Sequence, residues 1–511
     1  MSTVVRAVAA PPPPPTATIA SPPRREPGEA AGLPRLSPYA WGVIGITLVG
    51  LLARVVLLGR QALWRDEAFT ELTSRRSWLD MLDVVRHDSA PPLAYVLTHL
   101  ATSISTDSWA LRLPAALAGT AAIPLAAALG RRIGGNRCGL FAAALVMLGP
   151  PYVLGSRDAR MYALAGTMVL AVTLALWRAV EQPRRGRLVV LGACVAAALL
   201  TQYFTALGIV AAAVAALVVL RPSRETVRRC GAAMALGLVP LLVWLPFATP
   251  QLGHADAAFW VLPISGETLL GVLTQFFAGP PVDSGLAFRF QIQVAQGVAI
   301  TAGGYAGLVL IWHTIWRASP AQRRALAYVL GVGLGAVVLL LLISLRRSLV
   351  EARYASVIWP PLTVLIGVGM GHIRPRLLAA ACLFGTAVAT AMLVALPLHT
   401  NVMPALEEIG AAPPPHSLVL ARREVYLETL VAAPPRVRAI THVAAGSLEW
   451  FWGTAVFPGD AYIGSIPGDV TRVYDLYEEV TSTPYDPLRS AGFHIASTLC
   501  ADGACLTVWA R

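Results

Sequence analysis

Long apolar stretches separated by short charged loops occupy most of the chain. Each stretch is about 20 residues long, which is enough for an α-helix to cross a bilayer core of about 30 Å. We therefore predict an all-α polytopic membrane protein with about eleven membrane-spanning helices. The predicted spans lie at about 39–58, 109–130, 138–155, 160–181, 187–203, 204–220, 230–248, 290–316, 325–344, 354–371 and 377–397.

The arginines between these stretches predict the orientation. Basic loops stay on the cytoplasmic side of a membrane. The basic loops of this chain fall on one side together only if the apolar stretch Pro91–Ile104, about 14 residues long, does not cross. We predict a juxtamembrane helix there, lying in the interface. The basic loops are 131–137, 184–187, 221–229, 317–324 and 372–376.

Three regions follow from this topology. Residues 1–38, with the run Pro11–Pro15, are expected to form a disordered cytoplasmic tail. Residues 39–397 form the transmembrane domain. Residues 398–511 gain charge, lack long apolar runs, and are expected to form a small α/β domain outside the cytoplasm.

Within that last domain the pattern predicts both strands and helices. Cys500 and Cys505 flank the turn of a predicted hairpin. They pair in an oxidising compartment, or they remain two reduced thiols, and the sequence leaves both readings open. The predicted strands are 417–421, 437–443, 494–500 and 505–509, and the predicted helices are 424–431 and 470–480.

Composition agrees with a membrane protein and excludes some functions. Only 13% of the 511 residues are charged, against about 25% in soluble proteins. The net charge of +12 comes from loop arginines rather than from a basic domain with interleaved aromatics, so we expect no nucleic-acid partner. The absence of lysine and the abundant alanine indicate a GC-rich bacterial genome, and hence a bacterial plasma membrane.

One external loop carries charge that the topology does not explain. Arg346, Arg347 and Arg353 lie between Ser344 and Tyr354, on the side where positive charge is normally avoided. A bound anion would compensate, since the arginine fork matches phosphate oxygens. The alternatives are that the topology is wrong by one span, or that these side chains only meet lipid headgroups.

Several acidic residues are predicted on the same external side: Asp66 and Glu67 after the first span, Asp88, and Asp158 beside Arg160. A carboxylate can accept the proton of an attacking hydroxyl. Arginine, or a metal ion held by carboxylates, can stabilise a departing phosphate. Together with the external arginines, this set predicts transfer of a group from a phosphate carrier.

Each acidic residue also has a structural explanation. Adjacent carboxylates such as Asp66 and Glu67 are often simply solvated. Asp158 would form an ion pair with Arg157 or Arg160, and Asp88 would cap the helix that begins near Pro91.

Five motifs in order resemble the GT-C membrane glycosyltransferases, and most closely the protein O-mannosyltransferase and aminoarabinose transferase group. The resemblance covers about residues 40–370. The motifs are Trp64-Arg-Asp-Glu-Ala-Phe-Thr70, His87-Asp-Ser-Ala-Pro-Pro-Leu93, Leu111-Arg-Leu-Pro114, Arg157-Asp-Ala-Arg-Met-Tyr162 and Ala352-Arg-Tyr354.

The resemblance implies transfer of a sugar, with inversion, from a polyprenyl-phosphate carrier to an extracytoplasmic acceptor. Asp66 would be the general base or a metal-organising carboxylate, and Glu67 would assist it or be structural. Asp158 and Arg160 match the acid of the second external loop and its basic neighbour. The residues expected to hold the carrier phosphate are Arg353, Tyr354, Arg346, Arg347 and Arg160.

Further residues are candidates for the substrate pocket. Trp260, in the long external loop, is expected to anchor that loop in the interface or to form part of a lid. Gln202 departs from the histidine common in relatives, which leaves its role in doubt. The pocket candidates are Asp88, Tyr162, Gln202, Tyr203 and Trp260.

The function predicted from the sequence is therefore a membrane glycosyltransferase, with mannose as the expected sugar. Its partners would be the polyprenyl-phosphate sugar, membrane lipid, and a glycan, lipoglycan or protein acceptor. Asp66 and Asp158 permit a divalent ion, magnesium, manganese or calcium, without demanding one. The alternatives are a polyprenyl-phosphate-arabinose or other pentose transferase, a transporter or lipid flippase, and a catalytically silent scaffold.

Overall fold

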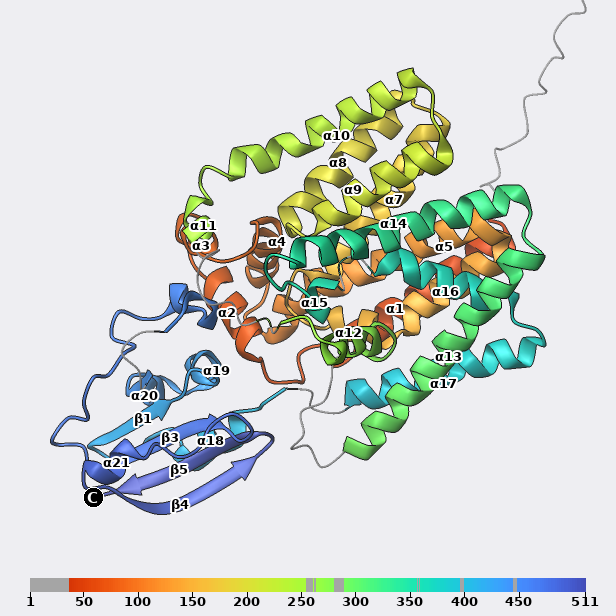
Figure 1. The fold of residues 1–511 in the computed structure, drawn as a ribbon. Coiled ribbons are helices and arrows are strands. Elements are labelled where there is room, and N and C mark those ends of the chain that lie inside the picture. Colours follow the sequence, from red (N-terminus) through yellow and green to blue (C-terminus); the bar gives the residue numbers. More distant parts are fainter. Residues whose placement is uncertain are drawn as a thin grey trace, which may run out of the picture.

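A bundle of long helices and a small sheet domain at one of its ends make up the structure (Figure 1), a computed structural model. Trp260 and almost all of the predicted N-terminal tail lie outside the described residues. The residues described are 36–253, 261, 263–279, 289–355, 357, 359–395, 399–443 and 448–511.

Every one of the eleven predicted spans contains a helix. The two spans at 109–130 and 138–155 belong to one long helix, which is broken at Gly135, where φ is 81°. The bundle helices are α1 Pro38–Val55, α5 Ser108–Leu148, α6 Pro150–Gly155, α7 Tyr162–Glu181, α8 Arg185–Thr201, α9 Thr205–Ala215, α10 Arg224–Trp244, α11 Thr249–Gly253, α12 Gly266–Ala278, α13 Arg289–Trp316, α14 Pro320–Ser344, α15 Ala352–Ala355, α16 Pro360–His372 and α17 Arg376–Ala395.

Among the described residues, seven helices are long and apolar enough to cross a membrane: α1, α5, α7, α10, α13, α14 and α17. The number is lower than eleven because α5 contains two predicted spans and three other helices are shorter. Helix α8 has 17 residues, α9 has 11 before a π-helical stretch, and α16 has 13. The chain is a multi-pass membrane protein, as predicted.

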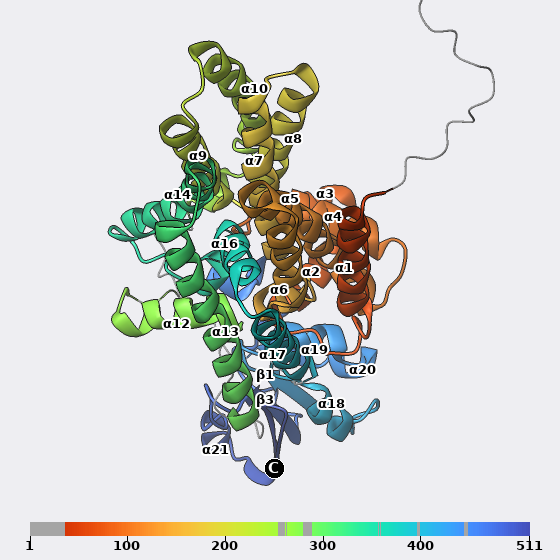
Figure 2. The same cartoon turned by 90° about the vertical axis from the view of Figure 1, so that its right-hand side faces the viewer.

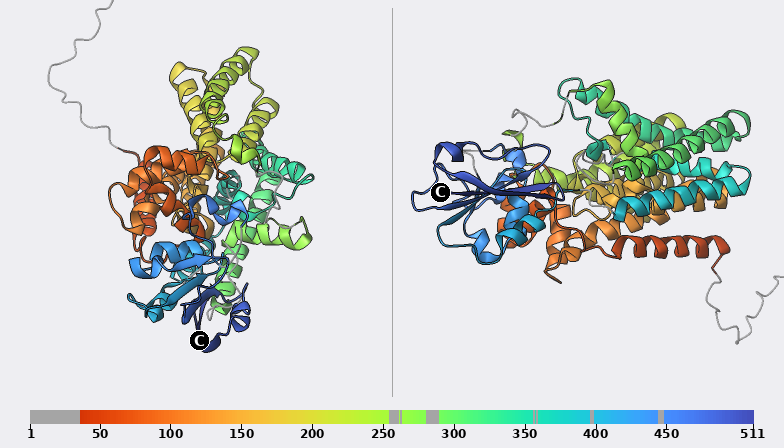
Figure 3. Two further views of the ribbon diagram at one scale, coloured as in Figure 1. Left: turned by 90° about the vertical axis from the view of Figure 1, so that its left-hand side faces the viewer. Right: turned by 90° about the horizontal axis from the view of Figure 1, so that it is seen from below.

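Three short helices follow α1 and lie at the end of the bundle that faces the sheet domain (Figures 1 and 3). They are α2 Arg65–Ser74, α3 Trp78–Val85 and α4 Leu93–Thr102. Helix α4 has 10 residues, which span about 15 Å and are too few to cross the bilayer. The predicted juxtamembrane helix is thus a separate short helix, as the parity of the basic loops required.

Small residues bring the bundle helices close together. Helix α16 packs against α5 through Gly367 and Gly371, and a Cβ atom on Gly367 would lie 2.4 Å from the Cα atom of Ala142. Such close approach is typical of membrane helices, whose association depends on packing rather than on the hydrophobic effect. The view in Figure 2 shows α16 beside α5 in the centre of the bundle.

Arg54, near the end of α1, is completely buried. It donates to the carbonyls of Gly50 at 3.0 Å and Val146 at 2.9 Å, and to the hydroxyl of Ser156 at 3.2 Å. A charged group inside the membrane region is costly unless such groups satisfy it. Arg54 therefore fastens the loop after α6, which carries functional candidates, to the first helix.

The C-terminal domain contains a five-stranded sheet in the order β2-β1-β3-β5-β4. Strand β1 pairs in parallel with β2 and β3, whereas β3 with β5 and β5 with β4 are antiparallel. The elements are α18 Met403–Ile409, β1 Ser417–Ala421, α19 Tyr426–Ala432, α20 Pro435–Arg438, β2 Thr441–Val443, two 3₁₀ turns Trp450–Trp452 and Thr454–Val456, β3 Arg472–Glu478, α21 Pro487–Ser490, β4 His494–Ala501 and β5 Ala504–Ala510.

The predictions for this domain are confirmed except in two places. The range 437–443 is a strand only from Thr441, after a helical turn. The predicted helix at 470–480 is wrong, because Arg472–Glu478 is the central strand β3. A central strand is buried on both faces, so its residues do not alternate, and the apolar spacing resembled that of a helix.

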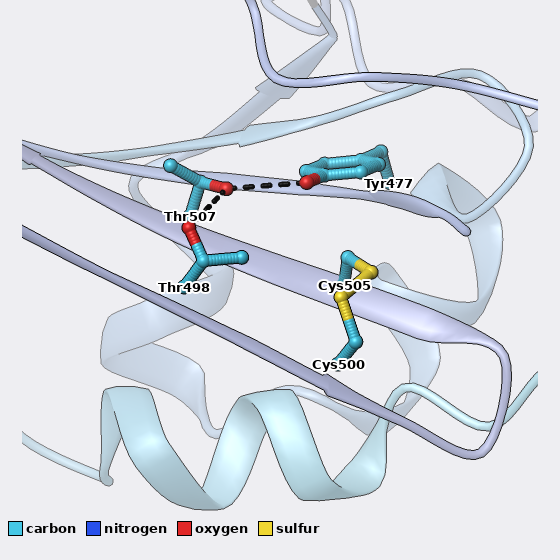
Figure 4. Close-up of a disulfide and its surroundings, with 5 residues drawn as sticks. All are labelled: Tyr477, Thr498, Cys500, Cys505 and Thr507. Atoms are coloured by element: carbon cyan, nitrogen blue, oxygen red, sulfur yellow. Dashed lines mark hydrogen bonds between the residues drawn. A yellow bond between two sulfur atoms is a disulfide. The ribbon is translucent and has the colours of Figure 1, made fainter. Parts of the chain in front are cut away.

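The predicted hairpin is confirmed, and its two cysteines form a disulfide (Figure 4). Cys500 and Cys505 are direct partners across strands β4 and β5. Nearby, Thr507 shares hydrogen bonds of 3.2 Å with Tyr477 and Thr498, which join three neighbouring strands. Of the two open readings, the structure therefore has the disulfide.

The close α5–α16 contact leads to a test. Gly367→Ala should destabilise the protein by about 1–3 kcal/mol, because the new methyl group meets backbone atoms that cannot move aside. Gly304→Ala in α13 is the control, since no heavy atom lies within 4 Å of its added Cβ atom. Thermal unfolding in detergent measures both, and equal midpoints for the two variants would contradict the packing described.

Candidate active site

An ion pair between Asp66 and Arg353 lies where the helical bundle meets the C-terminal domain. Arg353 Nη1 lies 3.0 Å from Asp66 Oδ2, and Arg65 Nε lies 3.5 Å from Asp66 Oδ1. Burial raises the pKa of Asp66, but the charges of Arg160, Arg353 and Arg65 outweigh burial and lower it to about 2. Asp66, in the first turn of α2, is therefore ionised at neutral pH.

Asp158 lies nearby in the loop between α6 and α7, in a different electrostatic environment. Its Oδ1 atom accepts a hydrogen bond of 3.1 Å from Trp64 Nε1. Burial, followed by the negative charge of Glu67, raises the pKa of Asp158 to about 7. Two carboxylates whose pKa values are pushed apart in one site are typical of enzymes that give them different tasks.

Glu67 and Arg112 form a buried ion pair next to both carboxylates. Arg112 donates from Nε to Glu67 Oε1 at 2.7 Å and from Nη2 to Oε2 at 2.5 Å, and both side chains are almost completely buried. Glu67 Oε1 also accepts from the backbone N–H of Ala159 at 2.9 Å. Because Asp66 precedes Glu67 and Asp158 precedes Ala159, this pair sets the spacing of the two candidate catalytic carboxylates.

Arg160 links Asp66 to Asp88 through Tyr95. Its Nη1 atom lies 3.3 Å from the Tyr95 hydroxyl and 3.2 Å from the Thr70 hydroxyl. The Tyr95 hydroxyl donates to Asp88 Oδ2 at 2.7 Å. The buried Nε–H group of Arg160 is a hydrogen-bond donor without a partner among the described residues.

Arg353 is also part of the lining of a cavity of about 380 Å³. Its walls come from α5, α6, α7, α16 and α17, and they are apolar at Ala122, Leu154, Pro360 and Val394. The rest of its lining includes charged and aromatic side chains, namely Trp64, Arg112, Arg157, Asp158, Tyr162, Glu351, Arg353 and His399.

A second cavity, of about 240 Å³, is lined by both members of the Asp66–Arg353 pair. Its lining is polar and aromatic, and it combines residues from the bundle with residues from the C-terminal domain. Tyr162 and Arg353 line both cavities. The lining residues of the second cavity are Arg65, Asp66, Phe69, Asp88, Ser89, Arg160, Met161, Tyr162, Gln202, Arg353, Tyr354, Leu427, Trp450, Phe451, Trp452 and Gly453.

Most of the residues singled out from the sequence lie around these two cavities. Tyr203 does not line them: its hydroxyl bonds to Gln251 Oε1 at 2.8 Å and Trp244 Nε1 at 3.1 Å. Arg346 and Arg347 are also absent from the described lining residues. The candidates that line a cavity are Asp66, Glu67, Asp88, Asp158, Arg160, Tyr162, Gln202, Arg353 and Tyr354.

The sequence reasoning missed other residues of the site. His399 stacks on Trp64, with ring centroids 4.5 Å apart, and lines the larger cavity. His399 lies just after the last predicted span and belongs to none of the five motifs, so the sequence did not single it out. Arg112 belongs to the motif Leu111-Arg-Leu-Pro114, but the sequence did not indicate a role for it. The aromatic run Trp450–Trp452 was visible as three large rings within a charged domain.

The carboxylates do not form a ready site for a resident metal ion. No group of three or more histidine, cysteine or acidic side chains within the described ranges could hold one. Asp66 already faces Arg65 and Arg353, and Asp158 accepts from Trp64. These partners donate hydrogen bonds or carry positive charge, so the surroundings of the two carboxylates do not fit a divalent cation.

Three comparisons with known proteins place this geometry in context. Residues 89–249 match the family model described as dolichyl-phosphate-mannose-protein mannosyltransferase. No curated protein matches the chain.

Among solved structures, ArnT from Cupriavidus metallidurans bound to undecaprenyl phosphate is similar, with a TM-score of 0.58 and 15% identity over 92% of this chain and 98% of that one. The oligosaccharyltransferase of Archaeoglobus fulgidus in its apo form gives a TM-score of 0.50 at 12% identity, over 86% and 69% of the two chains. At identities this low, the structural similarity establishes a shared fold and nothing more. The expected GT-C-like fold is confirmed.

The buried pair next to the carboxylates can be tested directly. Glu67→Gln should lower stability by about 3 kcal/mol, because it leaves the Arg112 charge buried without a carboxylate. Glu225→Gln breaks the exposed pairs with Arg228 and Arg229 and should change stability little. Thermal unfolding in detergent compares the two variants. A Glu67→Gln protein as stable as the Glu225→Gln control would contradict the structural role of the pair.

Proposed function

We propose that this chain, which has the fold of the GT-C membrane glycosyltransferases, transfers a sugar from a polyprenyl-phosphate carrier to an acceptor hydroxyl outside the cytoplasm. The observation that carries the proposal is the position of Arg353. It lines an apolar cavity between membrane helices and a polar cavity beneath the C-terminal domain, and it is held to Asp66 at the junction.

The donor would occupy the larger cavity. Its apolar walls suit the first isoprene units of a lipid, and Arg353 in its lining suits the phosphate, because a guanidinium binds phosphate oxygens in bidentate fashion. Tyr354 stacks on Phe204, with ring centroids 4.6 Å apart, and keeps the short helix α15 that carries Arg353 in place. The sugar would then lie at the junction, next to Asp66.

The acceptor would enter from the smaller cavity, where Asp66 is the proposed base. The positive charges around Asp66 make it a weak base. A phosphate bound to Arg353 competes with Asp66 for the guanidinium, which raises the pKa of the carboxylate. Donor binding thus strengthens the base at the moment when it is needed.

The reaction would be a single displacement. The acceptor oxygen forms a bond to the anomeric carbon as the bond from that carbon to the phosphate oxygen breaks. The hydroxyl proton passes to Asp66, and polyprenyl phosphate leaves with its negative charge on Arg353. Attack opposite the leaving phosphate inverts the anomeric centre. Each of these steps uses side chains of this chain, and no step is assigned to a metal ion.

The other acidic residues would have supporting roles. Glu67 positions the site through Arg112 and leaves no oxygen for chemistry. Asp158 lines the donor cavity, where a neutral carboxyl is compatible with a phosphate and a carboxylate repels it. Its raised pKa keeps it largely protonated below pH 7.

Mannose is the sugar we propose, on the match of residues 89–249 to a mannosyltransferase family model. The acceptor would belong to the cell envelope of a bacterium, as a glycan, lipoglycan or protein. A pentose donor such as polyprenyl-phosphate-arabinose is the alternative within the same chemistry, and the same transfer assay separates the two.

The first test is sugar transfer by the purified chain in nanodiscs, with radiolabelled polyprenyl-phospho-mannose and an envelope-lipid fraction as acceptor. Asp66→Asn should lower the rate by about 10²–10⁴-fold, the contribution of a general base. Asp83→Asn, at an exposed carboxylate of α3, is the matched control and should keep full activity.

Two further arms of this assay decide what remains open. Label transfer that persists in EDTA agrees with a site without an essential metal, and its loss would assign Asp66 and Asp158 to a cation. Polyprenyl-phospho-arabinose replaces the mannose donor if the latter is inactive. Equal rates for wild type and Asp66→Asn would refute the assigned base, and no transfer from either donor would favour a transporter.

The raised pKa of Asp158 predicts a pH effect on donor binding. As pH rises through about 7 the carboxyl ionises and repels the phosphate, so the KM for donor should rise roughly tenfold between about pH 6 and pH 8. Asp158→Asn stays neutral at every pH, and its donor KM should be flat. A donor KM that falls with rising pH, or the same slope in both proteins, would contradict this role.

A further inference from the structure

Three consecutive aromatic residues line the smaller cavity from the side of the C-terminal domain. Trp450, Phe451 and Trp452 form a 3₁₀ turn, and each ring is partly exposed rather than buried. Large aromatic side chains that stay partly exposed on a cavity wall are typical of ligand sites, because their faces offer apolar contact beside polar groups.

The turn is held firmly in its place. The guanidinium groups of Arg65 and Arg423 lie 4.8 and 4.7 Å from the centroid of the Trp452 ring. Gly453 follows with φ of 79°, and a Cβ atom there would lie 2.8 Å from Leu427 and 3.0 Å from Phe69. Gly453 therefore lies tightly against α19 and α2, and these contacts place the aromatic turn at the wall of the cavity.

Polar groups line the same cavity. Asp66, Asp88 and Gln202 offer carboxylate and amide oxygens and an amide N–H group. Two buried donors of the lining residues, Arg160 Nε and Trp452 Nε1, have no partner among the described residues. The acceptor oxygens of Asp66, Asp88 and Gln202 around this cavity suit a ligand rich in hydroxyl groups.

We infer that the acceptor is a saccharide, whose ring stacks on the Trp450–Trp452 turn while its hydroxyls bind the polar residues around Asp66. A sugar ring combines an apolar C–H face with a rim of hydroxyl groups, and the cavity combines the complementary surfaces. This inference rests on the proposed function, since it names the acceptor class of that reaction.

The size and walls of the cavity favour a sugar over a peptide. Its volume of about 240 Å³ is below the range of about 300–1,000 Å³ for drug-sized ligands, so it suits one sugar unit at a chain end. Extended peptides commonly bind by adding to an exposed strand edge. None of the described lining residues belongs to a strand. The described wall of the cavity therefore has no strand edge to which a peptide could add.

Binding can be measured without sugar transfer. The full chain in nanodiscs would be studied by saturation-transfer NMR with methyl α-mannoside, methyl α-arabinofuranoside and an acetylated Ala-Thr-Ala amide as probes. We expect saturation of the ring protons of at least one methyl glycoside and none of the peptide. Phe451→Ala and Trp450→Ala should each weaken that glycoside about tenfold, the effect of one lost ring contact.

Two control variants complete the experiment. Trp450→Phe keeps an aromatic face and should bind the glycoside within about threefold of wild type. Trp316→Ala removes a 71% exposed tryptophan at the end of α13, remote from the turn in sequence, and should bind normally. This control separates loss of the wall from general loss of a tryptophan.

The outcomes are decisive in both directions. Saturation of the peptide without any glycoside would make the acceptor a protein and overturn the inference. Glycoside binding unchanged in Phe451→Ala and Trp450→Ala, or no glycoside binding at all, would also overturn it. Failure of sugar transfer with glycoside binding intact would instead count against the proposed function, so the two failures can be told apart.

Discussion

The buried pair of Glu67 and Arg112 is the interaction on which the rest of the site depends. Removing two charges from water costs several kcal/mol per ion, and this cost is offset only when every remaining hydrogen-bonding position is filled. Here both carboxylate oxygens are bound to the guanidinium, and Arg112 also donates to the carbonyls of Leu58 and Gln61 at 2.8 and 3.1 Å. The pair therefore joins the chain after α1, helix α2, helix α5 and the loop before α7. Asp66 is next to Glu67 in sequence, and Asp158 is next to Ala159, whose N–H group binds Glu67.

The Glu67–Arg112 pair holds Asp66 and Asp158 close together, but the two carboxylates have different surroundings. Asp66 lies among arginines and stays ionised, whereas burial and the charge of Glu67 raise the pKa of Asp158 to about 7, so that it is only partly ionised at neutral pH. They also line different cavities, one walled by membrane helices and one closed by the C-terminal domain. Arg353 lines both cavities, so in the proposed reaction the lipid donor and the acceptor would meet at this arginine.

Much of the fold follows from hydrophobic patterning, and parts of the site do not. Apolar runs located a helix in each predicted span, and the parity of basic loops identified α4 as a short helix. Patterning failed for β3, whose burial on both faces removes the alternation that marks a strand. Asp66 and Arg353 are 287 residues apart in sequence. The topology placed both on the external side, but the pattern of residues did not predict their direct contact. His399 and the aromatic turn gave no periodic signal, because their roles arise from the docking of two domains.

The most direct measurement is a cryo-EM structure of the chain in nanodiscs with undecaprenyl phosphate. We expect phosphate density within hydrogen-bond distance of Arg353, the lipid along the cavity between α5, α7 and α16, and an Arg353–Asp66 distance longer than 3.0 Å. Phosphate bound instead at Arg346 or Arg347, with the Arg353–Asp66 pair intact, would contradict the central claim that Arg353 receives the carrier and releases the base.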